Sequence, residues 1–328
     1  MVATNVASIR LRFTNAVRCY ASYALSLLGS VRIVHAPMFV SVEPAAVCQL
    51  RCPECPVGQS KIKSEVFRLK NKPFMSLDIW HRVLSEIRDT AFVVQFYFQG
   101  EPLLNRDLPR MIREAHEAGL YTIVSTNAQA MTTDLAAQLI EAGLRRIIVS
   151  MDGLSQETYG AYRVGGNVER CKQALRWLHD EKKRQHGHTL IELQCLRLRS
   201  NEHEWHELKK HYRAFGADRF VLKTAQLYDY ENGHALMPTN LRYARYRIES
   251  DGRYHRKPMG KGCLRVWSGC VVTTTGEVLP CCYDKAHQYA YGNIMNRPLR
   301  ELFCSEKAIA FRRAAIKEQP PICKECGR

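Results

Sequence analysis

Two patterns of apolar residues alternate along the chain from Met38 onward. Short apolar runs typical of buried strands cover residues 38–43, 91–98, 121–125, 146–150, 190–197 and 219–223. Segments with apolar residues at helical spacing lie between them, at 77–87, 106–118, 133–143, 155–183 and 201–215. Counting the first from Met38, the pattern predicts six strand-then-helix units.

Polar residues and glycines mark the ends of several expected helices. Ser76 and Asn201 stand where N-caps are expected, and Asp78 falls in the first turn after Ser76. Gly119 and Gly143 each end a helical pattern, as C-terminal glycines commonly do.

Repeated units of this kind predict an α/β fold. Apolar strands joined through helices form a parallel sheet that the helices cover. The expected architecture is a partial (β/α)6 barrel of TIM type over residues 37–225, followed by a small cysteine-rich extension. Ligands of such folds bind at the carboxyl ends of the strands, so the loops there are the place to look for a site.

Residues 1–36 precede the first strand and predict a basic amphipathic helical extension, broken near Gly29. Its apolar positions at helical spacing are Ile9, Phe13, Val17, Tyr20, Ala24, Leu27 and Leu28, with Arg10, Arg12, Arg18 and Arg32 between them. We expect the apolar stripe to pack on the following domain. The alternative is peripheral contact with an anionic membrane surface.

The C-terminal part divides in two. Residues 226–260 have no clear period and are expected to form a linker. Residues 261–328 predict a small domain with a hairpin over 271–279 that turns at Thr275-Gly276, then a helical run over 299–317.

Composition narrows the class of protein. A chain of 328 residues that is 46% hydrophobic can bury a large core. The 48 Lys and Arg exceed the 32 Asp and Glu, and the net charge of +16 favours an acidic partner or an anionic surface. The basic residues are spread without a dense tract, so a solvated basic surface is the competing interpretation. No run of eighteen apolar residues predicts a membrane-spanning helix.

Thirteen cysteines without an assembled signal peptide predict a reducing, cytoplasmic location and metal chemistry rather than disulfides. Cys48, Cys52 and Cys55 place three thiols on one loop after the first strand. A closed zinc or iron-sulfur site takes four protein ligands, so a cube cluster held by three leaves one iron open. A zinc loop that borrows a ligand from elsewhere is the alternative.

A second group of cysteines lies near the C-terminus. Cys263 and Cys281 flank the expected hairpin, and Cys323 and Cys326 form a CxxC pair. Together they supply the four thiolates of a closed cube cluster or a structural zinc site. Cys282 is an alternative to Cys281.

The CxxxCxxC loop after a strand resembles the signature of the radical S-adenosylmethionine (SAM) superfamily. The resemblance implies a [4Fe-4S] cluster on Cys48, Cys52 and Cys55 whose open iron chelates SAM. It also implies reductive cleavage of SAM to methionine and a 5′-deoxyadenosyl radical, which abstracts a hydrogen atom from the substrate. Many members carry an aromatic residue before the third cysteine, where this chain has Glu54.

The resemblance extends to the loops after the next strands. Gly100-Glu101-Pro102 resembles the family's GGEP turn, whose backbone accepts hydrogen bonds from the SAM amino group, with Gln99 in place of the first glycine. The remaining residues implied to contact the ribose or the methionine carboxylate are Ser125, Asn127, Ser150, Asp152 and Arg163. By themselves such residues are more often turn formers, caps or surface ion pairs. The chain has no GxGxxG or GxxxxGK[ST] phosphate loop.

The C-terminal cysteines resemble the SPASM and twitch extensions of this superfamily. Full SPASM domains carry seven cysteines and two clusters, whereas this chain ends just after its CxxC. The resemblance to twitch-type aminocyclitol dehydrogenases implies one auxiliary [4Fe-4S] cluster on Cys263, Cys281, Cys323 and Cys326. Cys281 keeps the family's five-residue offset from Gly276.

These features predict a radical SAM oxidoreductase that performs a two-electron oxidation of a sugar or cyclitol, or modifies a peptide. A flavodoxin- or ferredoxin-type protein is the expected electron donor. A redox-neutral epimerase with a cysteine as hydrogen donor is one alternative. A non-catalytic zinc-binding nucleic-acid module is another, although no basic, aromatic-interleaved stretch adjoins the cysteines.

Overall fold

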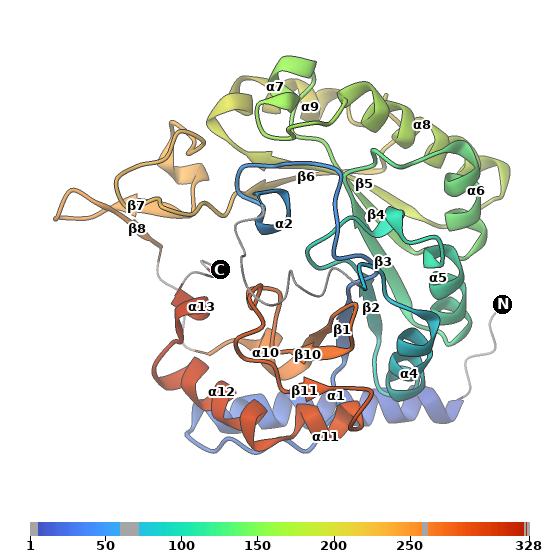
Figure 1. The fold of residues 1–328 in the computed structure, drawn as a ribbon, viewed down its shortest axis with the longest axis vertical. Coiled ribbons are helices and arrows are strands. Elements are labelled where there is room, and N and C mark those ends of the chain that lie inside the picture. Colours follow the sequence, from blue (N-terminus) through green and yellow to red (C-terminus); the bar gives the residue numbers. More distant parts are fainter. Residues whose placement is uncertain (1–5, 60–71, 258–261, 325, 327–328) are drawn as a thin grey trace. The chain divides into compact units, whose positions relative to one another are not determined.

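The computed structural model describes residues 6–59, 72–257, 262–324 and 326 (Figure 1). The chain forms two compact units. Unit 1 comprises Met1–Val47, Ile62–Ile123 and Gly260–Cys326, and unit 2 comprises Cys48–Lys61, Val124–Met259 and Gly327–Arg328.

The sheet of unit 1 is built around the first strand. Strand β1 (Phe39–Val42) pairs in parallel with β2 (Val93–Phe96) on one side and with β9 (Gly269–Val272) on the other. Strands β10 (Glu277–Leu279) and β11 (Gly292–Asn293) continue it antiparallel, in the order β11-β10-β9-β1-β2. The expected C-terminal hairpin is therefore present, and it extends the same sheet as the first strand.

Helices of unit 1 begin where the sequence indicates. Helix α4 (Leu77–Ile87) starts at Ser76, whose side chain accepts a hydrogen bond from the N–H of Ile79. The α4 residue Trp80 is fully buried and its ring lies 5.3 Å from that of Phe96 on β2. The short helix η2 (Pro102–Leu104) and helix α5 (Leu108–Glu117) follow β2.

The C-terminal part of unit 1 holds four short helices. They are α10 (Leu264–Ser268), α11 (Leu299–Phe303), α12 (Glu306–Lys317) and α13 (Pro321–Lys324). The helical run expected over 299–317 is divided because Ser305 caps α12, accepting from the N–H of Ala308. Gly276 has φ +85° at the hairpin turn, a conformation that favours glycine.

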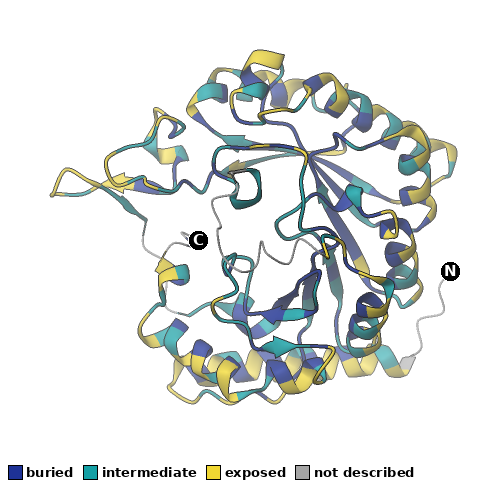
Figure 2. Ribbon diagram, in the orientation of Figure 1, coloured by how far each residue is buried: buried dark blue, intermediate teal, exposed yellow. Residues whose placement is uncertain are grey.

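Helix α1 (Val6–Leu27) is present and ends just before Gly29, as expected. It buries its polar face instead of its apolar stripe. The residues that it buries in unit 1 are Arg12, Asn15, Cys19, Ser22 and Ser26. Its apolar stripe stays exposed, shown as yellow segments along α1 in Figure 2. The expectation that this stripe packs on the following domain is wrong, because the neighbouring backbone offers carbonyl groups that the polar face can bind.

Unit 2 contains parallel strands covered by helices. Strand β4 (Arg146–Ser150) pairs with β5 (Leu190–Arg197), which pairs with β6 (Arg219–Thr224). The chain passes between the units within β3 (Tyr121–Thr126). The helices that follow β3 and β4 are α6 (Thr133–Glu141), α7 (Gln156–Gly160) and α8 (Val168–Arg184). The predicted α/β fold with a parallel sheet is confirmed.

Two stretches of unit 2 differ from expectation. Asn201 is not the N-cap residue of a helix; it lies fully buried within the 3-10 helix η3 (Arg199–Glu204), which precedes α9 (Trp205–His211), and its Oδ1 accepts from the N–H of the N-cap residue Leu198. The described part of the expected linker forms η4 (Leu241–Tyr243), β7 (Tyr246–Ile248) and β8 (Tyr254–Arg256).

The expected linker also contributes to a core. Buried residues Leu227, Met237 and Tyr246 cluster with Leu50 and Cys52 of the cysteine loop. This stretch therefore packs on that loop rather than only connecting domains. No helix in the described ranges is both long and apolar enough to span a bilayer.

Candidate functional site

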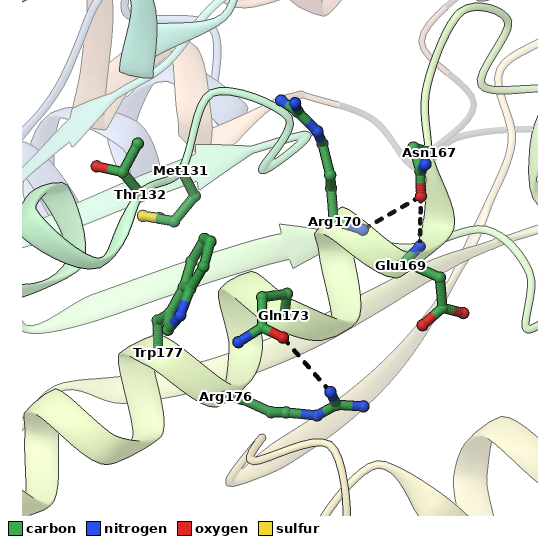
Figure 3. A pocket seen from close by; sticks show the side chains of 8 residues that line it. All are labelled: Met131, Thr132, Asn167, Glu169, Arg170, Gln173, Arg176 and Trp177. Carbon is green, nitrogen blue, oxygen red and sulfur yellow. Dashed lines mark hydrogen bonds between the residues drawn. The ribbon is translucent and has the colours of Figure 1, made fainter.

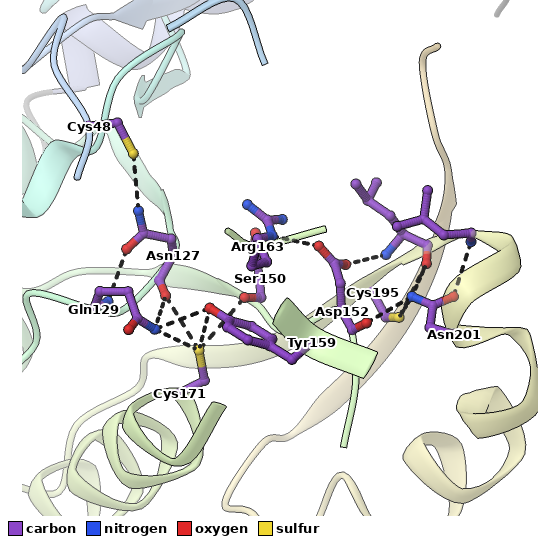
Figure 4. Close-up of polar contacts among 12 residues, drawn as sticks. Cys48, Asn127, Gln129, Ser150, Asp152, Tyr159, Arg163, Cys171, Cys195 and Asn201 are labelled. Carbon is purple, nitrogen blue, oxygen red and sulfur yellow. Dashed lines mark hydrogen bonds and ion pairs between the residues drawn. The ribbon is translucent and has the colours of Figure 1, made fainter. Parts of the chain in front are cut away.

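The cysteine loop lies in unit 2 and continues into the short helix α2 (Pro56–Gln59). Cys52 is buried, whereas Cys48 and Cys55 are partly exposed. The Cys48 sulfur accepts from the N–H of Leu50 and from Nδ2 of Asn127, each at 3.4 Å (Figure 4). Asn127, predicted from the loop after the third strand, is thus beside the first cysteine.

Arg163 and Asp152, both predicted site residues, form an ion pair. Nε of Arg163 lies 2.6 Å from Oδ2 of Asp152, and the Asp152 side chain is 1% exposed. Burial raises the pKa of the Cys52 thiol, and the charge of Arg163 acts against this rise. Burial lowers the pKa of Arg163, but the Asp152 carboxylate, together with Cys52, Tyr162 and Tyr159, outweighs this effect and holds the pKa above its ordinary value. Arg163 is therefore a fixed cation next to the second cysteine.

The Asp152 carboxylate and backbone are held by residues that the sequence did not assign to the site. Oδ1 of Asp152 accepts from the N–H of Leu196 at 2.6 Å, at the end of β5. Nδ2 of Asn201 donates to the Asp152 carbonyl at 2.9 Å. No local pattern identifies Asn201 as a support, because its partner lies 49 residues away.

Gln129 is another supporting residue that the sequence did not assign to the site. Its N–H donates to Oδ1 of Asn127 at 2.9 Å, and its side chain donates to the hydroxyl of Tyr159 at 3.1 Å. The buried Cys171 thiol lies 3.4 Å from the Asn127 carbonyl. These contacts orient Asn127 toward Cys48, as Figure 4 shows.

The remaining predicted residues of unit 2 stand at the carboxyl ends of strands. Ser125 is the penultimate residue of β3 and is half-buried. Ser150 ends β4 and is buried. Both positions agree with the expectation that site residues follow the strands.

Glu54, which stands where many family members have an aromatic residue, is buried and engaged with the expected linker. Its Oε2 accepts from the N–H of Tyr228 at 2.5 Å, and its Oε1 lies 3.5 Å from Nε2 of His234. The carboxylate therefore ties the cysteine loop to residues 226–257.

The predicted glycine turn lies in unit 1. A Cβ at Gly100 would stand 2.1 Å from the carbonyl oxygen of Ala45, so only glycine fits there. The N–H of Glu101 donates to the carbonyl of Val47 at 2.8 Å, and Glu101 caps η2 by accepting from Leu103. The turn is thus bound directly to the backbone that leads from β1 toward the cysteine loop.

The C-terminal cysteines also lie in unit 1. Burial and then the neighbouring Cys282 raise the pKa of the Cys281 thiol, and Cys323 and Cys326 act on it as well. Cys282 instead accepts a hydrogen bond from Nη1 of Arg265 at 2.8 Å. Cys263 precedes α10 and is partly exposed. Cys281 therefore has both CxxC thiols among the groups that act on it.

The donor sets suit iron-sulfur clusters in their chemistry. Sulfur ligands of such clusters accept N–H hydrogen bonds, and Cys48 already accepts two. Cys48, Cys52 and Cys55 would hold the first cluster, and the four C-terminal thiols would hold the second. Within the described ranges, no three His, Cys, Asp or Glu side chains are gathered closely enough to hold a metal ion as they stand.

A cavity of about 430 Å³ opens beside the start of α8 (Figure 3). Its lining includes Met131, Arg170 and Trp177 and none of the predicted site residues. No residue of the cysteine loop lines this cavity.

Comparison with known proteins supports the interpretation of both cysteine groups. A model described as the radical SAM superfamily matches residues 42–193, and one described as an iron-sulfur cluster-binding domain matches residues 263–327.

Curated relatives include two peptide cyclases. The PqqA peptide cyclase of Rhodopseudomonas palustris is 28% identical over 271 residues, covering 75% of this chain and 67% of the relative. That of Rhizobium meliloti is 26% identical over 317 residues, covering 89% and 80%. This chain thus spans about two thirds of the first relative's length.

Solved structures share the fold. BtrN in complex with AdoMet and 2-DOIA aligns with a TM-score of 0.54 at 19% identity, covering 88% of this chain and 91% of BtrN. Streptococcus suis SuiB bound to the precursor peptide SuiA aligns with a TM-score of 0.62 at 14% identity, covering 92% and 71%. At these identities the likeness concerns the fold alone.

Proposed function

The chain belongs to the radical SAM superfamily and carries a SPASM domain, and from this premise we propose that it modifies a peptide by radical chemistry. Its cofactors are SAM, a SAM-binding [4Fe-4S] cluster and an auxiliary cluster. The observation that carries the proposal is that a chain with the three-cysteine loop has PqqA peptide cyclases as curated relatives, and that these relatives match most of its length.

When bound, the cofactors would supply one electron that cleaves SAM and a 5′-deoxyadenosyl radical that removes a hydrogen atom from the substrate. They would also supply an acceptor for the second electron, which the substrate loses together with a proton. The residues of the chain bind and orient. Asn127 donates a hydrogen bond to the Cys48 sulfur, and the charge of Arg163 counteracts the rise that burial causes in the pKa of Cys52; both effects favour the thiolate forms. Gly100 keeps the turn after β2 free of a side chain on the face against Ala45.

We assign the auxiliary cluster to Cys263, Cys281, Cys323 and Cys326. Four thiolates close the coordination of such a cluster, so it has no open iron for substrate. An electron-transfer role follows, and with it a net two-electron oxidation of the substrate. The net charge of +16 favours an acidic donor of flavodoxin or ferredoxin type, and the cysteine-rich composition favours the cytosol.

A second candidate is oxidation of a sugar or cyclitol. BtrN, whose complex contains AdoMet and 2-DOIA, matches this chain over 91% of its own length, whereas the first peptide cyclase is covered over only 67%. The four C-terminal thiols assigned above also match the expected single auxiliary cluster of that type of enzyme.

The first test measures release of 5′-deoxyadenosine from SAM by anaerobically reconstituted protein after chemical reduction. We expect release from the wild type and none from the Cys48→Ala, Cys52→Ala and Cys55→Ala variants. Cys304→Ala is the matched control, because Cys304 belongs to neither group and its thiol donates to the backbone carbonyl of His35. Bound zinc in place of iron and sulfide would contradict the proposal.

The second test separates the substrate classes without knowing the substrate. The enzyme is incubated with SAM and with an extract of cells that naturally contain this protein and were grown in deuterated medium. Deuterium in the released 5′-deoxyadenosine is then measured by mass spectrometry. Transfer that disappears after protease treatment of the extract supports a peptide. Transfer that survives protease indicates a small molecule, and deuterium entering product from heavy-water solvent indicates an epimerase.

A further inference from the structure

Helix α1 is fixed to unit 1 through its polar face. The Arg12 guanidinium donates to the carbonyls of Gly119, Arg88 and Ala118 at 2.6 to 2.7 Å, which are terminal carbonyls of α4 and α5. Asn15 exchanges two hydrogen bonds with the backbone of Ala36 at 3.0 and 2.8 Å. These bonds determine which side of the helix faces the protein.

The opposite side of α1 presents apolar side chains to solvent. Nine of the fourteen exposed large hydrophobic residues of the described chain lie between positions 9 and 34: Ile9, Leu11, Phe13, Val17, Tyr20, Leu25, Leu27, Leu28 and Val34. Val17 is 68% exposed, Tyr20 54% and Leu28 85%. Isolated exposed hydrophobic residues are ordinary, but a gathering of this kind marks an interaction surface.

The charge around this stripe has a single sign. Residues 1–42 contain no Asp or Glu and four Arg. Arg10, Arg18 and Arg32 are exposed, and the described structure gives none of their side chains an ion pair or hydrogen bond. The surface is therefore apolar with free positive charges beside it.

We propose that the exposed face of α1 docks the protein on an anionic lipid membrane. A helix of 22 residues is about 33 Å long and can lie in the interface with its apolar side chains among the acyl chains. Arginines at its edge meet the lipid phosphates. A second copy of the chain fits this face less well, because pairing two such helices brings their arginines together without a counter-charge.

The test is sedimentation of the full cluster-loaded chain with vesicles of phosphatidylcholine mixed with phosphatidylglycerol, compared with phosphatidylcholine alone. We expect the protein to sediment with the anionic vesicles and to be released at least in part by 0.5 M salt. Protein that remains in the supernatant with anionic vesicles, or that sediments equally with both, overturns the proposal.

Two triple variants make the test specific. Val17→Gln/Tyr20→Gln/Leu28→Gln removes apolar groups from the stripe and should lower the partition coefficient at least tenfold. Phe74→Gln/Ile248→Gln/Met295→Gln changes three exposed hydrophobic residues elsewhere and should leave it unchanged. Both variants should still cleave SAM, which shows that they fold.

Two further results would overturn the proposal. One is equal loss of binding in the two triple variants. The other is stripe-dependent self-association in the absence of lipid, seen by light scattering, which would assign the face to a second copy.

Discussion

Nε of Arg163 lies 2.6 Å from Oδ2 of Asp152, in a pair from which solvent is largely withdrawn. Eleven residues separate them, and the turn after α7 brings the arginine back to the loop after β4. The sequence resemblance assigned Arg163 to the SAM carboxylate. The structure gives it a protein carboxylate as its partner.

Removing both members of this pair should cost less stability than the two single losses added together. Arg163→Met leaves the Asp152 carboxylate buried without its cation, and Asp152→Leu leaves the guanidinium unpaired. Each single variant should lose about 3 kcal/mol of unfolding free energy. The double variant should lose clearly less than the sum, measured by chemical unfolding; additive losses would show that the two charges do not depend on each other.

Replacement of Cys281 should remove the auxiliary cluster, and replacement of Cys282 should not. Wild-type protein is expected to bind about eight irons and eight sulfides in two cubes. Cys281→Ala should fall to about four of each, while Cys282→Ala keeps about eight, because Cys282 accepts a hydrogen bond from Arg265 whereas both CxxC thiols act on Cys281. The measurement is iron and sulfide analysis after anaerobic reconstitution; the reverse pattern would make Cys282 the ligand.

An alanine at Gly100 should disturb the turn after β2. Its Cβ would meet the Ala45 carbonyl oxygen at 2.1 Å, and backbone must shift to accept it. We expect a loss of about 1 to 3 kcal/mol in stability and slower SAM cleavage. Gly160→Ala is the control, since its nearest neighbour would be a flexible Gln156 side chain at 3.4 Å. Equal behaviour of the two variants would contradict this role of Gly100.

Stability should rise with pH between about 4 and 6.5 through His35. This side chain is 1% exposed, and burial lowers its pKa from 6.5 to about 4, with Arg312 of α12 acting in the same direction. Below 6.5 the unfolded chain binds a proton that the folded chain rejects, so the contribution is complete above 6.5 and is lost as pH falls toward 4.

The slope in that interval should be about 1.4 kcal/mol of unfolding free energy per pH unit. His35→Gln removes the titration, so thermal or chemical unfolding over this pH range should give the variant a flatter profile than the wild type. Parallel profiles would show that other groups cause the pH dependence.

Local patterns in the sequence predicted the elements well. Strands β4 and β5 have the bounds that their apolar runs gave, and Ser76 caps α4 as expected. An apolar run and a hydroxyl N-cap are local features, because each is formed by residues that are close together in the sequence. The spacing of Cys48, Cys52 and Cys55 is equally local, which is why the family was recognisable from the sequence.

Predictions that needed distant partners were less successful. The buried face of α1 could not be chosen from its periodicity, because the carbonyls that bind Arg12 come from residues 88, 118 and 119. Asn201 is a residue type that often caps helices, yet its side-chain amide donates to the Asp152 carbonyl. Glu54 likewise gains its partner, Tyr228, from a stretch expected to be a linker.

By itself, the sequence determined the alternation of strands and helices and the three thiols on one loop, because periodicity, caps and cysteine spacing operate within a few residues. Only the tertiary structure decided that β9 pairs with β1, that Asp152 holds Arg163, and that α1 turns its apolar side to solvent. Each of these outcomes depends on which buried polar group finds a hydrogen-bond or ionic partner, and such partners come together only when the chain has folded.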